Sequence, residues 1–219
     1  MFMKVKRKGF MEFIVIPYGS GWEDYRICIN GRETTLYTST TRGKYLSEFL
    51  RTLCYFHKDY GSYDYVDGLL DLEEFDWGEY GVEKIPLSTT FTWDGETKAM
   101  HWKMIRGDAI TEDDFLLDIQ ITRDFWLAEE KDDFSFTVSY RELCYAVAKG
   151  VTDTLKKHGF MGWSKSAYEL TLELRYLVFL KAYVLGKLSK IVSDYKQPKG
   201  VGPRSSFRNE WRILLKELK

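Results

Sequence analysis

Apolar and polar residues alternate along several short segments of this sequence, and a period of two predicts β-strands. The first such segments cover residues 10–17, 24–30 and 34–39. Tyr25, Ile27 and Ile29 would lie on the buried face of the second segment. Asn30-Gly31 is a pair favoured in two-residue hairpin turns, so it should connect the second strand to the third.

A second series of strands is predicted in the middle of the chain. Asp94-Gly95 indicates a hairpin after a strand at 87–93, and Arg106-Gly107-Asp108 should form the next turn. The apolar positions that would face the core are Met100, Trp102, Met104, Phe115, Leu117, Ile119, Ile121, Phe134, Phe136 and Val138. His101 and Lys103 would face the opposite way. The pattern is that of an antiparallel meander.

Apolar spacing of three and four residues predicts four helices. One covers about 44–57. The next begins at a capping box, Ser139 with Glu142, and should end at Gly159. A box at Ser166 and Glu169 should open a long helix over 167–192. The last helix would follow Ser205 or Ser206 and would turn four side chains inward, Trp211, Leu214, Leu215 and Leu218.

These elements predict an α+β fold, in which an antiparallel sheet of about seven strands is packed on one face by three or four helices. Residues 1–219 would form a single domain, with a subdivision near 59–84 left open. The three cysteines, Cys28, Cys54 and Cys144, are too few and too scattered for a disulfide framework, which favours a reducing compartment.

The sequence also bears on localisation. The apolar run at 10–16 is broken by Glu12 and ends at Pro17, so we expect a strand there and not a signal peptide. The most apolar predicted helix, 167–192, should not span a membrane, because it contains Glu169, Glu173, Arg175, Lys181 and Lys187. We therefore expect a cytoplasmic protein without membrane association.

The net charge of −1 conceals a strong asymmetry along the chain. Residues 59–83 contain nine carboxylates and no Lys or Arg, and residues 108–133 contain ten carboxylates against two basic side chains. Residues 141–219 contain sixteen basic residues against seven acidic ones. Such an asymmetry influences the choice of partner and the association rate, and it says nothing about the fold.

Aromatic residues interleave with the carboxylates of the first acidic segment. Tyr and Trp are favoured anchors at interfaces, and carboxylates steer a basic partner, so this combination favours a protein-binding surface over a merely solvated loop. The candidate partner-binding residues are Tyr63, Asp64, Tyr65, Asp67, Asp71, Glu73, Glu74, Phe75, Asp76, Trp77 and Glu79.

The sequence therefore predicts a non-enzymatic protein that neutralises a basic protein partner, for example a nuclease-type toxin. Its broad type would be that of a small bacterial immunity protein or antitoxin. The alternative is a hydrolytic enzyme that uses a pair of carboxylates, as glycosidases do. Nucleic acid is a disfavoured partner, because the acidic half would repel phosphate unless the two poles are well separated.

Metal and cofactor sites are not expected. Cys54 and His57 have a spacing that suits two metal ligands, but no second Cys/His pair exists, so a core position for Cys54 is the simpler interpretation. In the acidic segment, Tyr63, Tyr65 and Leu69 fall where the ligands of an EF-hand calcium loop should be, so no EF-hand is expected. No Gly-rich phosphate loop and no nucleophile elbow occurs in the sequence.

Overall fold

The computed structural model describes residues 11–18, 22–39, 45–58, 60, 75–76, 87–94, 98–125, 132–166, 172–192 and 207–218. Within these residues the chain forms eight strands and five helices. The strands are β1 (Met11–Tyr18), β2 (Trp22–Ile29), β3 (Arg32–Ser39), β4 (Phe75–Asp76), β5 (Ser88–Asp94), β6 (Lys98–Thr111), β7 (Asp114–Phe125) and β8 (Asp132–Ser139). The helices are α1 (Tyr45–Tyr55), α2 (Tyr140–Ser166), α3 (Leu174–Val184), α4 (Leu188–Val192) and α5 (Phe207–Leu215).

The fold is α+β, but the strands form two antiparallel sheets and not the predicted single one. The small sheet has the order β1-β2-β3 and the large sheet the order β4-β5-β6-β7-β8. The apolar faces of the two sheets pack against each other, with the rings of Tyr25 and Trp93 only 4.9 Å apart. Packing face to face lets each sheet bury the apolar side of the other. If the two sheets were joined edge to edge, the helices alone would have to cover these apolar sides.

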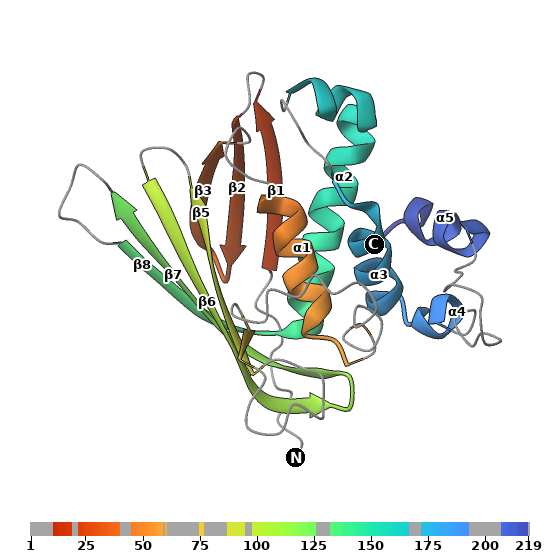
Figure 1. The fold of residues 1–219 in the computed structure, drawn as a ribbon, viewed down its shortest axis with the longest axis horizontal. Coiled ribbons are helices and arrows are strands. Elements are labelled where there is room, and N and C mark those ends of the chain that lie inside the picture. Colours follow the sequence, from red (N-terminus) through yellow and green to blue (C-terminus); the bar gives the residue numbers. More distant parts are fainter. Residues whose placement is uncertain are drawn as a thin grey trace, which may run out of the picture.

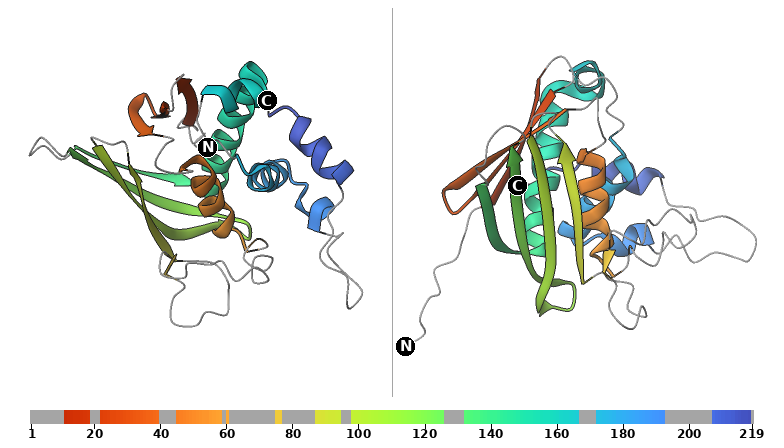
Figure 2. Two further views of the ribbon diagram at one scale, coloured as in Figure 1. Left: turned by 45° about the horizontal axis from the view of Figure 1, so that its top comes forward. Right: turned by 60° about the vertical axis from the view of Figure 1, so that its left-hand side comes forward.

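Helix α1 and the two sheets share one aromatic core. The ring of Phe49 lies 5.8 Å from Phe13 of the small sheet and 5.1 Å from Trp102 of the large sheet. These side chains are buried, as are the predicted inward positions Met100, Met104, Leu117 and Ile119. Figure 1 shows the large sheet at one side of the molecule and α2 to α5 at the other, and both views of Figure 2 agree.

The first hairpin turn forms where the sequence predicts it. Asn30 and Gly31 both have positive φ, 52° and 77°, as the mirror-image hairpin turn requires. Tyr25, Ile27 and Ile29 are buried on one face of β2, which confirms the alternation.

The predicted turn at Arg106-Gly107-Asp108 is wrong. These residues continue β6, whose pairing with β7 shifts register between Arg106 and Ala109 and again between Ala109 and Thr111. The chain reverses at Glu112 and Asp113 instead. Bulges accommodate the extra residues of β6, so the strand continues through Gly107, a residue type that would otherwise indicate the end of a strand.

Helix α2 begins at the predicted cap. The hydroxyl of Ser139 accepts a hydrogen bond from the backbone N–H of Glu142 at 3.2 Å. Asp114 of β7 adds a second cap, since its carboxylate accepts hydrogen bonds from the Ser139 hydroxyl at 2.9 Å and from the Arg141 N–H at 3.0 Å. Gly159 has φ 66° and interrupts the helix, but helical backbone resumes as far as Ser166.

Helix α2 approaches the backbone of β1 closely at Gly150, where there is no side chain to keep them apart. A Cβ atom built on Gly150 would lie 1.9 Å from the carbonyl oxygen of Phe13. One turn further along α2, the hydroxyl of Thr154 donates a hydrogen bond to the carbonyl oxygen of Val15 at 3.2 Å. Helix α2 therefore covers the backbone edge of β1, an edge that would otherwise be open.

The C-terminal helices differ from the prediction in two respects. The predicted helix over 167–192 is interrupted at Gly186, where φ is 62°, and Ser166 ends α2; residues 167–171 lie outside the described part of the chain. In α5, Leu214 and Leu218 are buried as predicted, but Trp211 and Leu215 are 46% and 61% exposed. Helix α5 packs on α3 through Ile213 and Leu214, and this face is too narrow to include the other two side chains.

Candidate functional site

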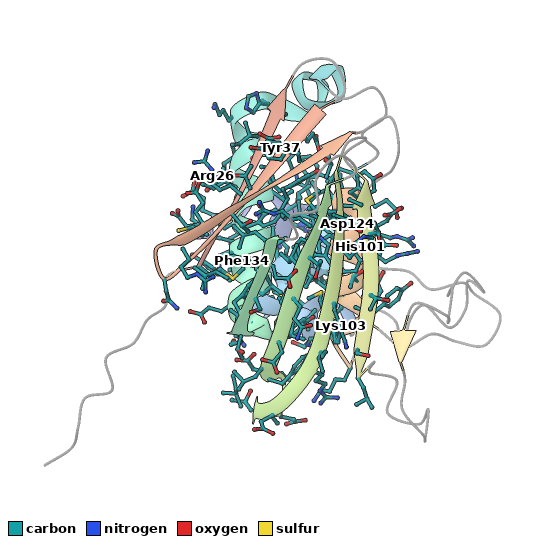
Figure 3. All side chains as sticks on the ribbon, turned by 90° about the vertical axis from the view of Figure 1, so that its left-hand side faces the viewer. Arg26, Tyr37, His101, Lys103, Asp124 and Phe134 are labelled. Carbon is teal, nitrogen blue, oxygen red and sulfur yellow. The ribbon has the colours of Figure 1, made fainter. Side chains whose placement is uncertain are left out.

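The candidate functional site is the outer face of the large sheet, the side that points away from the core and the helices (Figure 3). No described helix or strand covers this face, and most of its side chains are polar. The polar ones are Thr90, Thr92, His101, Lys103, Asp118, Gln120, Thr122, Asp124, Asp133, Ser135 and Thr137. The alternation of the strands places these residues here, since each neighbours an inward apolar residue.

A row of interacting side chains crosses three strands of the outer face. The hydroxyl of Thr92 on β5 lies 2.9 Å from Nδ1 of His101 on β6. On the other side, Nε2 of His101 lies 3.8 Å from a carboxylate oxygen of Asp124 on β7. A second cross-strand pair joins Thr137 of β8 to Asp118 of β7, where the hydroxyl donates to the carboxylate at 2.5 Å.

A hydroxyl, an imidazole and a carboxylate are also the groups of a hydrolytic triad, but the geometry at His101 differs from one. The contact with Asp124 exceeds hydrogen-bond length, and both side chains are 48% exposed. A nucleophile on such an open surface would lack the water-excluded surroundings that stabilise a transition state. The outer face is better suited to binding, because it offers donors, acceptors and charge on a flat support.

The sequence-predicted partner-binding residues are placed only in part. Phe75 and Asp76 form β4, which pairs with Thr89 and Ser88 at the edge of the large sheet. The other nine lie outside the described residues: Tyr63, Asp64, Tyr65, Asp67, Asp71, Glu73, Glu74, Trp77 and Glu79. The acidic segment therefore reaches the same sheet whose outer face forms the candidate site.

The charge asymmetry of the sequence becomes a partial separation in space. The described parts of β5 to β8 and of their connections contain nine carboxylates against four basic side chains. Residues 140–166, 172–192 and 207–218, which include α2 to α5, contain twelve basic side chains against five carboxylates. The outer face lies on the opposite side of the large sheet from the helices (Figure 1). The acidic residues at the β6–β7 turn instead contact the helices, since Asp114 accepts a hydrogen bond from the Arg141 N–H of α2 and the carbonyl oxygen of Asp113 accepts one from the Tyr183 hydroxyl of α3.

A groove of about 930 Å³ runs between β1 and α2, and it is the place to look for a carboxylate pair. Three carboxylates line it, those of Glu12, Glu142 and Asp153. All three residues are exposed, and Asp153 is paired with Lys149 at 2.5 Å. A general acid of the glycosidase type needs a desolvated carboxyl, so this groove gives the hydrolytic alternative no support.

Two of the buried charged side chains, Lys181 and Glu23, lie away from the outer face and make hydrogen bonds in the interior. Lys181 of α3 is fully buried, and its ammonium group donates to the carbonyl oxygen of Leu214 at 2.6 Å. Burial, helped by the charge of Lys156, lowers the pKa of Lys181 to about 8. In the small sheet, the buried carboxylate of Glu23 accepts a hydrogen bond from the Tyr25 hydroxyl, and burial with this charge raises the tyrosine pKa.

Cys54 and His57 have structural surroundings. Cys54 is buried, as expected of a core cysteine, and its thiol donates to the carbonyl oxygen of Tyr176 at 3.6 Å. The ring of His57, two residues beyond α1, lies 4.7 Å from Tyr183 and 5.4 Å from Phe179. Across the described residues, no three His, Cys, Asp or Glu side chains are grouped as a metal site would need.

Sequence reasoning placed His101 and Lys103 on the polar side of their strand but missed the row that His101 forms. The missing information was the register, because Thr92 and Asp124 become neighbours of His101 only through pairing of β5, β6 and β7. The Asp94-Gly95 signal would not have supplied this register, because a two-residue turn there would place Thr92 opposite Thr97, whereas β5 and β6 pair Asp94 with Ala99 and Thr92 with His101.

Among the described residues, none of the helices has the length and apolarity needed to cross a membrane.

Comparisons with known proteins give this chain no relative. No protein-family model matches the sequence, and no curated protein and no solved structure is significantly similar to it.

Proposed function

We propose that this chain is a non-enzymatic binding protein that docks a basic protein partner on the outer face of its large sheet. The observation that carries the proposal is the meeting of both acidic segments of the sequence in this one sheet, opposite the basic helices. Binding there would cover the basic surface of the partner, so that this surface could not bind other molecules. We propose that this binding neutralises a toxin, as an immunity protein or antitoxin does.

Electrostatics supports a fast and salt-sensitive association. A surface with an excess of one charge steers an oppositely charged partner and raises the on-rate, most strongly at low ionic strength. The outer face contributes Asp118, Asp124 and Asp133 against the single ammonium group of Lys103. The helical pole would repel the same partner, so the bipolar charge also orients the encounter.

The test is charge reversal on the outer face. A partner should first be isolated from the source cell by cross-linking to the wild-type chain. The triple variant Asp118→Lys, Asp124→Lys and Asp133→Lys should then slow association with this partner at least tenfold and remove most of its salt dependence. The matched control Asp153→Lys, Glu210→Lys and Glu217→Lys makes the same change in net charge on the helical side and should leave association fast.

A further variant separates the outer face from the acidic segment. Reversing Asp71, Glu73, Glu74 and Asp76 to Lys tests the contribution of residues 59–83 with the outer face intact. If only this variant weakens binding, the interface lies on the acidic segment alone. Unchanged binding in both acidic variants would refute the proposed docking of a basic partner.

A further inference from the structure

Four exposed apolar side chains form two pairs in surroundings of opposite charge. Trp211 and Leu215 are 46% and 61% exposed on α5. Ile110 is 50% exposed on β6, just before its turn into β7, and Leu87 is 47% exposed next to the start of β5 at the same end of the large sheet. Large exposed apolar side chains within a charged rim are typical of protein–protein contacts.

The first pair lies in a basic patch. Arg208, Arg212 and Lys216 follow one another along the exposed side of α5 at intervals of about 6 Å, beside the two apolar side chains. We name Arg208, Trp211, Arg212, Leu215 and Lys216 the α5 patch. Lys187, which directly precedes α4, extends it, since the nearby ammonium group of Lys216 lowers the pKa of Lys187.

The second pair lies in an acidic patch. Asp108, Glu112 and Asp113 are exposed around the turn between β6 and β7. The backbone carbonyl of Leu87 accepts a hydrogen bond from the Arg106 N–H at 2.8 Å, which places Leu87 beside the part of β6 that leads to this turn. We name Leu87, Asp108, Ile110, Glu112 and Asp113 the hairpin patch. Lys58 contacts both Glu112 and Asp113 at 2.7 Å, so a single cation balances two of the three carboxylates.

We propose that the α5 patch of one molecule docks on the hairpin patch of a second copy of this chain. The two patches match in charge and in apolar content, with two apolar anchors on each side. They lie on different elements, so the contact joins unlike surfaces and leaves one patch of each kind open on every dimer. Such an arrangement grows head to tail into rings or chains.

A second copy is favoured over an unrelated partner because both halves of the contact are present on the same molecule. A net charge of −1 also leaves copies without strong overall repulsion, so that complementary patches decide their approach. This inference does not depend on the proposed function, since the hairpin patch shares no residue with the outer face.

The test is sedimentation velocity of the wild-type chain over a concentration series at low and at high salt. We expect species larger than the monomer that increase with concentration and decrease with salt. A chain that sediments as a monomer at every concentration in low salt would overturn the proposal.

Mixing two variants tests the head-to-tail geometry. The first variant, Arg212→Gln with Leu215→Ser, damages the α5 patch; the second, Ile110→Ser with Glu112→Gln, damages the hairpin patch. Each alone should be monomeric. An equimolar mixture should form a dimer and nothing larger, because only one intact pair of patches remains. A mixture that stays monomeric, or a single variant that associates as the wild type does, would exclude this contact.

A matched control uses the small sheet. Ile14 is 36% exposed on β1, next to a carboxylate, so Ile14→Ser with Glu12→Gln makes the same kind of change away from both patches. This control should keep the association of the wild type. A control that becomes monomeric would show that β1 forms the contact and would overturn the assignment to α5.

Discussion

Replacing Gly150 with alanine should strongly destabilise this protein, although the same change in most helices stabilises. In a helix interior, alanine is favoured over glycine by about 1 kcal/mol. Here the new Cβ would lie 1.9 Å from the carbonyl oxygen of Phe13 and 2.9 Å from its carbonyl carbon. An ordinary contact exceeds 3 Å, so strand and helix must separate by more than 1 Å.

The strand has little freedom to move. Phe13 pairs with Ile27 of β2, and its ring packs on Phe49 in the aromatic core. Moving β1 would also lengthen the hydrogen bond between the hydroxyl of Thr154 and the carbonyl oxygen of Val15, which contributes about 1 kcal/mol. Overpacking typically costs about 1–3 kcal/mol. The loss of the hydrogen bond and the gain in helix propensity offset each other, so we expect a net loss of about 1–3 kcal/mol.

Urea titration followed by circular dichroism measures this loss directly. For a chain of this length, the melting temperature should fall by roughly 2–12 °C. Gly159→Ala is the matched control on the same helix: no atom lies within 4 Å of its built Cβ, so only the positive φ of 66° opposes the change, at about 1 kcal/mol. A Gly150→Ala variant as stable as the wild type would show that α2 does not rest on the backbone of β1.

Two further changes test the cap of α2 and the buried lysine. Ser139→Ala should lower the free energy of unfolding by about 1–2 kcal/mol in urea titrations, because Glu142 and Asp114 both lose a hydrogen-bond partner, whereas Ser135→Ala on the exposed face of β8 should change it by less than about 0.5 kcal/mol. The pKa of Lys181 is about 8 in the folded chain against about 10.4 when unfolded, so protonation below pH 8 disfavours folding and this cost is relieved as the pH rises. The free energy of unfolding of the wild type should therefore rise by about 2 kcal/mol between pH 7 and pH 9.5 relative to Lys181→Met, and parallel pH curves would show that the lysine is not buried.

Local patterns in the sequence predict most elements of this fold. Alternation identified the strands and their buried faces, as in β2 and β7, because the pleat forces successive side chains to opposite sides. Ser139 was identifiable as a cap since its hydroxyl satisfies a backbone group only three residues away. Such features depend on neighbours along the chain, so the sequence alone contains them.

Features that depend on distant residues could not be predicted in the same way. The division into two sheets is determined by which strands pair, and the row around His101 requires the register of three strands. Gly150 looked like an ordinary helical residue, because the atom that excludes a side chain belongs to Phe13, far away in sequence. Trp211 and Leu215 fit an apolar stripe, but α3 offers α5 too little surface to bury them.

The contact between β1 and α2 also has a consequence for biosynthesis. The hydrogen bond from Thr154 to Val15 spans 139 residues, so a ribosome completes the small sheet long before it completes the helix that covers the sheet's edge. During this interval the β1 edge offers unpaired backbone groups to other nascent chains. The hairpins of β1 to β3 are local and can form early, whereas closing the long loop to α2 is slow. Late docking of α2 would then be the step at which the nascent chain becomes safe from misassembly.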